Sequence, residues 1–198
     1  MANTNAPYGF RQYAGTGSAP TYEQVAVAIA YDASAIYFGD PVYPSTSGTV
    51  AIGTPGTTQI AGIFVGCKYL STSQKRTVWS NYWPGSDVAS GNVVEGYIIN
   101  DPNAKFVAQI GGSTSVGAVA GDVNTNVQFA YGTGNTANGI SGAYVDISVT
   151  PTTTNTLPFR IVSLVTSPPG AAGTEAGAYN YVVVAFNNVS TKQLLSVA

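Results

Sequence analysis

Side chains that carry out catalysis are sparse in this sequence. Histidine is absent, so Ser-His-Asp and Cys-His nucleophile arrangements and histidine-ligated zinc sites are excluded. The single cysteine, Cys67, ends the apolar run 62–67, and no imidazole is available to activate its thiol. We therefore expect Cys67 to be a small buried core residue.

Acidic residues and glycine-rich segments do not complete a site either. The 9 acidic residues show no sequence context that marks a general acid and base pair. Segment 122–126 begins like a calcium loop, but Val127 stands where glycine is needed and Thr133 where a bidentate glutamate is needed. Segment 132–139 lacks the helix and lysine that complete a phosphate-binding loop. We interpret both segments as surface turns and predict a protein that is not an enzyme, with no catalytic residue, cofactor or metal.

Aromatic side chains are the remaining candidates for a binding site. In the predicted strand 76–83, alternation places Trp79 and Trp83 on one face. Such a pair is consistent with a core, a protein interface or a sugar-stacking platform. The polar segment 1–21 also holds aromatic and basic residues, which could anchor a partner or pack within the protein's own oligomer. The predicted partner-binding residues are Tyr8, Phe10, Arg11, Trp79 and Trp83.

Short alternating segments predict the elements that must position these residues. Residues 24–31 alternate with a period of 2, and 59–70 is the strongest apolar run. Closely spaced turn residues separate about ten such segments, and helix signals are nearly missing. The sequence therefore predicts an all-β fold, an antiparallel β-sandwich or jelly-roll-like domain over 22–198, preceded by an extended N-terminal arm over 1–21. A subdivision near 111–126 stays open.

Composition narrows the classes of partner. The chain has 198 residues, of which 44% are hydrophobic and only 8% charged, against about 25% charged in average soluble proteins. The net charge of -2 argues against a sequence-independent grip on nucleic acid. No apolar stretch approaches the roughly 18 residues of a membrane span. We predict neither a nucleic-acid nor a membrane partner, and a surface covered by small polar residues, as on proteins that work in an assembly.

Several stretches resemble a family of small proteins of tailed bacteriophages. The stretches are GIFVGCKY (62–69), VWSNYWPG (78–85) and GYIINDPNAKF (96–106), with the opening residues 1–10 and the late segment 183–188. Proteins of this family are encoded beside the major capsid protein and act as capsid decoration, or cement, proteins. The shared stretches are structural, so no catalytic residue is carried over. Relatives carry a histidine after the late asparagine pair, where this chain departs from the pattern with Val189.

This resemblance implies a structural role in the virion. It implies an all-β homotrimer, made in the host cytoplasm, that binds the major capsid protein on the outer capsid surface at local threefold positions. The segment 1–21 is then a natural strap, because an extended segment covers much surface with few residues. The alternative is a receptor- or carbohydrate-binding module that resembles the head domain of a tail spike and takes a host-surface glycan. Fold alone cannot separate the two functions.

Overall fold

The structure, a computed structural model, describes residues 3–15, 24–57, 59–149 and 151–191. Its regular elements within these ranges are β1 (Arg11–Ala14), β2 (Val25–Ile29), β3 (Pro41–Pro44), β4 (Val50–Ile52), β5 (Gly62–Ser71), β6 (Arg76–Ser80), β7 (Val94–Ile99), β8 (Lys105–Gly111), the 3-10 helix η1 (Ala120–Asp122), β9 (Asn126–Tyr131), β10 (Ala143–Asp146), β11 (Phe159–Leu164) and β12 (Tyr181–Phe186).

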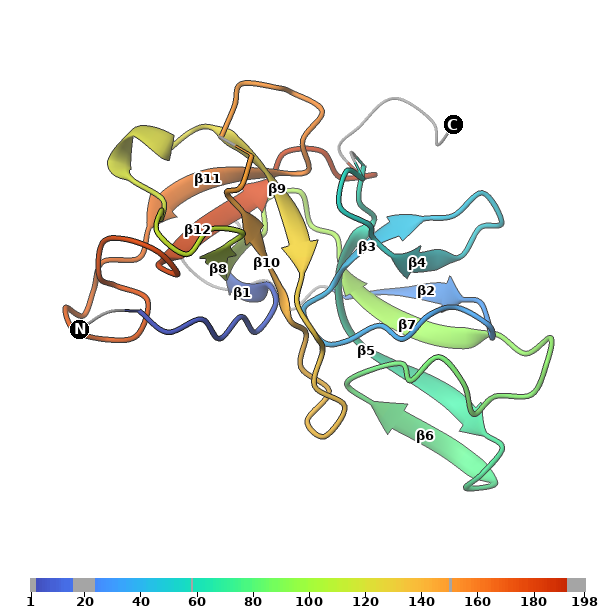
Figure 1. The fold of residues 1–198 in the computed structure, drawn as a ribbon. Coiled ribbons are helices and arrows are strands. Elements are labelled where there is room, and N and C mark those ends of the chain that lie inside the picture. Colours follow the sequence, from blue (N-terminus) through green and yellow to red (C-terminus); the bar gives the residue numbers. More distant parts are fainter. Residues whose placement is uncertain (1–2, 16–23, 58, 150, 192–198) are drawn as a thin grey trace.

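The strands form two six-stranded sheets that pack against each other (Figure 1). The first sheet has the order β3-β4-β2-β7-β5-β6, and the second has the order β1-β8-β10-β9-β11-β12. The all-β prediction is confirmed, with two packed sheets as a β-sandwich requires. The finer description, a jelly roll with a separate N-terminal arm, is not confirmed. The chain passes from the first sheet to the second at 100–104. Segment 111–126, near which the sequence leaves a subdivision open, instead connects β8 and β9 of the second sheet.

Each sheet closes on itself. In the first sheet β3 pairs with β5 as well as with β4, so β2, β4, β3, β5 and β7 form a ring. In the second sheet β12 pairs with β8, so β8, β10, β9, β11 and β12 form a ring. Closure pairs backbone groups that an open sheet would leave at its edges.

The two rings have the same topology. In each ring the first strand in chain order pairs in parallel with the third, and all other pairs are antiparallel. In each ring the fourth strand carries a register shift opposite the fifth, between Phe64 and Gly66 in the first ring and between Ile161 and Ser163 in the second. The fold therefore repeats one five-stranded ring topology. Strand β6 is added to the first ring at β5, and β1 is added to the second ring at β8.

Two apolar clusters fill the rings. The first contains inward residues of the first ring, among them Phe64, Trp83 and Ile98. The second contains inward residues of the second ring, and it also takes in Ile63 and Ile99 from the first. The outward side of the first ring at Ile63 and Ile99 is therefore covered by the second ring. This contact holds the sheets together by apolar burial.

The N-terminal residues 3–15 are bound to the second sheet. Strand β1 pairs antiparallel with the first half of β8, and β10 pairs in parallel with its second half. Ahead of β1, the buried amide of Gln109 accepts a hydrogen bond from Ala6 N at 2.9 Å and donates one to Thr4 O at 2.9 Å. Gln109 also donates to Tyr179 O at 3.1 Å. Residues 1–2 and 16–21 of the predicted arm lie outside the described residues.

A buried polar cluster joins the sheets at the start of β3. The carboxylate of Asp40, which is 1% exposed, accepts hydrogen bonds from Ser141 Oγ and, at 2.7 Å, from Tyr37 N. Nearby, Tyr131 donates to Pro41 O at 2.7 Å. The backbones approach so closely that a side chain at Gly9, whose φ is 78°, would lie 2.9 Å from the carbonyl oxygen of Gly39. This junction fixes how the two rings meet.

We predict that Asp40 makes the protein less stable as pH rises through the mildly acidic range. Burial raises the pKa of Asp40 to about 6, and hydrogen bonds from Ser141 and Tyr37 offset only part of this effect. The folded state therefore holds a proton that the unfolded state releases near pH 4, so the free energy of unfolding falls between about pH 4 and about pH 6, by about 3 kcal/mol. Urea unfolding across this range should show the fall in the wild type and not in Asp40→Asn.

The matched control for this experiment is Asp32→Asn, because Asp32 is exposed. It should keep the wild-type pH dependence. The same fall in Asp40→Asn as in the wild type would show that another group titrates in this range.

We also predict that Gln109→Leu loosens the N-terminal segment. The substitution leaves Ala6 N, Thr4 O and Tyr179 O without their partner, which costs about 1–3 kcal/mol in the free energy of unfolding. Hydrogen–deuterium exchange of residues 3–15 should speed up. Gln74→Leu, at an exposed turn position, is the control and should leave exchange there unchanged. Unaltered exchange in Gln109→Leu would mean that β1 alone holds the segment.

Candidate binding surface

Two of the predicted partner-binding residues lie in the core. Phe10 is 1% exposed and stacks on Phe159, with 4.5 Å between ring centroids. Trp83 is 0% exposed, and its Nε1 donates a hydrogen bond to Ala33 O at 3.1 Å. Neither side chain presents a surface to a partner, so the structure corrects these two assignments. Both are large apolar side chains whose burial stabilises the fold more than exposure would.

The prediction that Trp79 and Trp83 share a face is wrong. Strand β6 ends at Ser80, so the alternation that relates the two residues stops between them. Trp83 instead forms an isolated bridge with Ile36 and turns into the first ring, while Trp79 remains 68% exposed. Trp79 is the most exposed of the large hydrophobic side chains in the part of the chain that the structure describes.

Tyr8 and Arg11 are half-buried and contact other parts of the same chain. The Tyr8 ring packs edge-on against Tyr181 at 5.4 Å between centroids, and burial raises the pKa of Tyr8 to about 12. The Arg11 guanidinium lies 4.4 Å from the centroid of the Phe38 ring, and its Nε donates to Tyr8 O at 3.2 Å. Arg11 thus links the N-terminal segment to the first sheet. A role of Tyr8 and Arg11 in partner binding stays a prediction.

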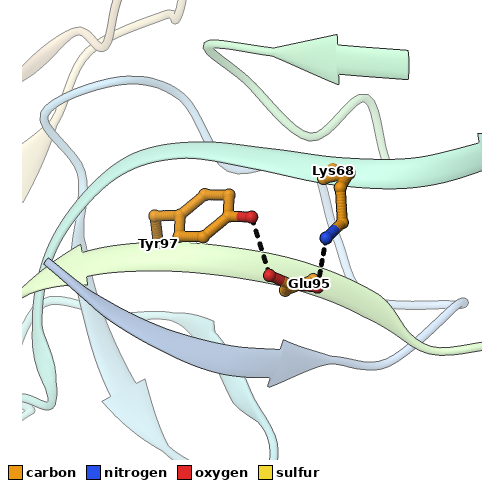
Figure 2. Close-up of polar contacts among 3 residues, drawn as sticks. All are labelled: Lys68, Glu95 and Tyr97. Atoms are coloured by element: carbon orange, nitrogen blue, oxygen red, sulfur yellow. Dashed lines mark hydrogen bonds and ion pairs between the residues drawn. The ribbon is translucent and has the colours of Figure 1, made fainter. Parts of the chain in front are cut away.

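Trp79 belongs to a connected set of side chains on the outward face of the first sheet. This set, Lys68, Trp79, Glu95 and Tyr97, is called the Trp79 surface below. The Trp79 and Tyr97 rings are nearly parallel, with 5° between their planes and 5.9 Å between centroids. Lys68 Nζ lies 5.1 Å from the Trp79 centroid and 2.7 Å from Glu95 Oε2. Tyr97 donates a hydrogen bond to Glu95 Oε1 at 2.7 Å, so Glu95 ties together β5 and β7 (Figure 2).

Register explains why these residues meet. Lys68 on β5 is directly opposite Trp79 on β6 and Glu95 on β7, and opposite residues of antiparallel strands share a face. Tyr97 lies two positions from Glu95 and so points the same way. Sequence reasoning missed Lys68, Glu95 and Tyr97. The alternation of Glu95 and Tyr97 was available as a signal, but their proximity to Trp79 depends on a pairing that the sequence does not state.

The charges of the Trp79 surface stabilise one another. The hydrogen bond to Glu95 raises the pKa of Lys68, and the same bond lowers the pKa of Glu95. The hydrogen bond with Glu95 also raises the pKa of Tyr97. All of these groups therefore keep their ordinary charge at neutral pH. The pair is solvent-exposed, so it orients side chains more than it stabilises the fold.

The residues beside the Trp79 surface have small side chains or none. Ala26 and Ala28 on β2 stand opposite Tyr97 and Glu95, and Gly66 on β5 is paired with Tyr97. A hollow of about 530 Å³ lies beside the Trp79 and Tyr97 rings, and Gly66, Gln24 and Asn81 are among the residues that line it. A protruding aromatic beside small residues lets another molecule approach closely.

Cys67 lines the same hollow from β5 but is not a nucleophile. It is 1% exposed, its Sγ lies 3.4 Å from Tyr82 O, and burial raises the pKa of its thiol to about 12. The thiolate is therefore negligible at neutral pH. The prediction of a buried core cysteine is confirmed.

The turn interpretation of segment 122–126 agrees with the structure. Asp122 Oδ2 accepts a hydrogen bond from Val119 N at 2.8 Å, and Asn126 Nδ2 donates to Thr154 O at 2.9 Å. Asp122 thus serves a local backbone group, whereas Asn126 bonds the backbone 28 residues further along the chain, and the two side chains do not share a partner. Within the described ranges, no group of three or more Cys, Asp or Glu residues could hold a metal ion.

Comparisons with protein-family models, with curated proteins and with solved structures give no match. In the described part of the chain, no helix has the length and apolar character needed to cross a membrane. Function is therefore inferred from the residues and their geometry.

We predict opposite behaviour for the two tryptophans. Trp83→Phe removes buried volume and the hydrogen bond to Ala33 O, and should lower the free energy of unfolding by about 2–4 kcal/mol. Trp79→Phe should change it by no more than about 0.5 kcal/mol. Iodide should quench the fluorescence of Trp83→Phe, in which the exposed Trp79 remains, and should hardly quench Trp79→Phe. Equal quenching in both variants would contradict the burial difference.

Proposed function

We propose that this protein is a capsid decoration protein that binds the outer surface of a phage shell and clamps neighbouring major capsid protein subunits. The observation that carries the proposal is the exposure of Trp79 on the outward face of the first sheet. A large aromatic that is held in place and surrounded by small residues is typical of a protein-binding hot spot. The resemblance of the middle stretches to phage decoration proteins supplies the identity of the partner.

Rigidity of the Trp79 surface supports a protein partner. Lys68, Glu95 and Tyr97 hold one another through an ion pair and a hydrogen bond, and the Tyr97 ring lies parallel to the Trp79 ring. A side chain that is ordered before binding loses less conformational entropy when a partner covers it. The low charge of the chain, 8% of residues, suits an interface that depends on apolar contact and shape.

A trimer on the shell would bind more strongly than its single contacts suggest. Once one subunit is bound, the Trp79 surfaces of the other subunits face the shell at high effective concentration. We therefore propose a homotrimer on the outer capsid surface, with each subunit contacting a major capsid protein subunit. Modest single contacts are then sufficient for stable decoration.

A receptor- or carbohydrate-binding module is the second candidate function, and one observation favours it. The hollow beside Trp79 is lined by the aromatic residues Trp79 and Tyr97 and by the polar residues Gln24, Ser80 and Asn81. Aromatic rings beside polar residues can take the apolar face and the hydroxyl groups of a sugar. A glycan array probed with the full chain tests this candidate directly.

We predict that Trp79→Ala weakens binding to empty shells of the phage that encodes the chain. Cosedimentation of the wild type should saturate at a simple ratio of bound copies to capsid subunits and should raise the melting temperature of the shell. Trp79→Ala should lose at least about tenfold in affinity. Val149→Ala, which removes a hydrophobic side chain of 64% exposure from the segment after β10, is the control and should bind like the wild type.

The outcomes separate the two candidates. Absence of wild-type cosedimentation would contradict the decoration proposal. Binding to a glycan that Trp79→Ala abolishes, without any binding to shells, would establish the second candidate.

A further inference from the structure

A groove of about 540 Å³ lies on the outward face of the second sheet, where β1, β8, β11 and β12 meet the turn between β7 and β8. Its lining includes two cations, Lys105 and Arg160, and three asparagines, Asn103, Asn124 and Asn187. None of the described residues that line it is acidic. In a chain with only 7 lysines and arginines and a net charge of -2, this concentration of positive charge is local and specific.

The register places the two cations on either side of a small residue. Lys105 on β8 is opposite Ala185 on β12, and Ala185 is opposite Arg160 on β11. Directly opposite residues share a face, and neighbouring strands are about 4.8 Å apart, so the Cα atoms of Lys105 and Arg160 are about 10 Å apart. Ala185 forms a low floor between them. The width suits an extended segment or a carboxylate that both cations reach.

Both cations have capacity for an anion. Arg160 is exposed, and its Nη2 donates to Asn124 Oδ1 at 2.9 Å, which orients the guanidinium without neutralising it. Lys105 Nζ makes one long contact, 3.4 Å, with Gly15 O. Neither cation forms an ion pair within the described ranges, and the nearby Asp101 accepts a hydrogen bond from Asn103 N at 2.8 Å. A carboxylate from another molecule would find charge-assisted donors already in place.

We propose that this groove, here called the cationic groove, binds an acidic segment of a partner protein. The groove is far larger than a simple inorganic anion, so the charged group sits on a larger body. Its aromatic lining residue, Phe186, is 2% exposed and presents no ring face for stacking a sugar. The asparagine side chains offer both donors and acceptors, as a peptide backbone requires.

The repeated ring topology adds a second, independent reason for a protein occupant. Aligned on the register shifts, Ala185 and Arg160 of the second ring correspond to Ile99 and Ile63 of the first. In the first ring, Ile63 and Ile99 are covered by the second ring. The cationic groove is thus the second ring's copy of a position where the first ring already accepts polypeptide.

Isotope-labelled full chain titrated with a short end-blocked glutamate peptide tests the proposal, with the matched glutamine peptide as reference. The glutamate peptide should shift the amides of Lys105, Arg160 and Ala185 and should bind about tenfold more tightly than the glutamine peptide. Arg160→Gln and Lys105→Gln should each weaken binding by about fivefold to tenfold. Added salt should weaken it further.

The control variant is Lys75→Gln, at an exposed position in the turn after β5, and it should bind the glutamate peptide like the wild type. If Lys75→Gln lost as much affinity for the glutamate peptide as Arg160→Gln, the peptide would be attracted to positive charge in general. If the glutamine peptide bound as tightly as the glutamate peptide, the carboxylates would have no role in binding. Tighter binding of galacturonate than of the peptide would assign the groove to an acidic sugar instead. Inorganic phosphate binding as tightly as the peptide would mean an adventitious ion only. Each of these results would overturn the proposal, whatever the outcome of the shell-binding experiment.

Discussion

Closure of the two rings is the constraint on which the other features depend. The pairing of β3 with β5 and of β12 with β8 provides internal partners for backbone groups that an open sheet would expose. Other strands must then attach outside a ring, as β6 does at β5 and β1 does at β8. The exposed Trp79 sits on the first of these additions, and Gly15, next to the second, borders the cationic groove. The closed rings form the framework, and the added strands β6 and β1 contribute to the Trp79 surface and the cationic groove.

The junction between the rings combines apolar contact with a few buried polar groups. Ile63 and Ile99 supply apolar contact, which is not directional. Asp40, Ser141 and Tyr131 form hydrogen bonds at this junction, and hydrogen bonds, unlike apolar contacts, are directional. They therefore restrict the orientation in which the two rings can meet. A buried carboxylate is costly unless it is hydrogen-bonded or protonated, and Asp40 is hydrogen-bonded with a raised pKa.

Several features of the fold follow from the sequence because they are local. The alternation over 24–31 predicts a strand that matches β2 to within a few residues, and the apolar run 59–70 predicts one that matches β5 to within a few residues. The apolar surroundings of Cys67 correctly indicate its burial. The pairing of β2 with β4 and of β8 with β10 is not local, so closure of the rings and their shared topology were not predictable from spacing.

The errors at the candidate site have the same physical origin. The alternation that placed Trp79 and Trp83 together assumed that one strand continues to residue 83, whereas β6 ends at Ser80. Phe10 lies in a polar segment, so its burial depends on Phe159, which is far away in the chain. Lys68, Glu95 and Tyr97 become neighbours of Trp79 only through the registers of β5 with β6 and β7. Each of these residues needed a cross-strand partner that no local pattern identifies.

Equivalent positions in the two rings are used differently. If the second ring had isoleucines in place of Ala185 and Arg160, it would present the apolar position that the first ring uses to bind its neighbour. A further copy could then dock in the same way, and such head-to-tail contacts propagate without limit. Arg160 stands in place of one of the two isoleucines, and Lys105 lies two strands away on the other side of Ala185. Burying these cations has a desolvation cost, which disfavours another apolar ring face. The same two cations leave the position open to a partner that brings the opposite charge.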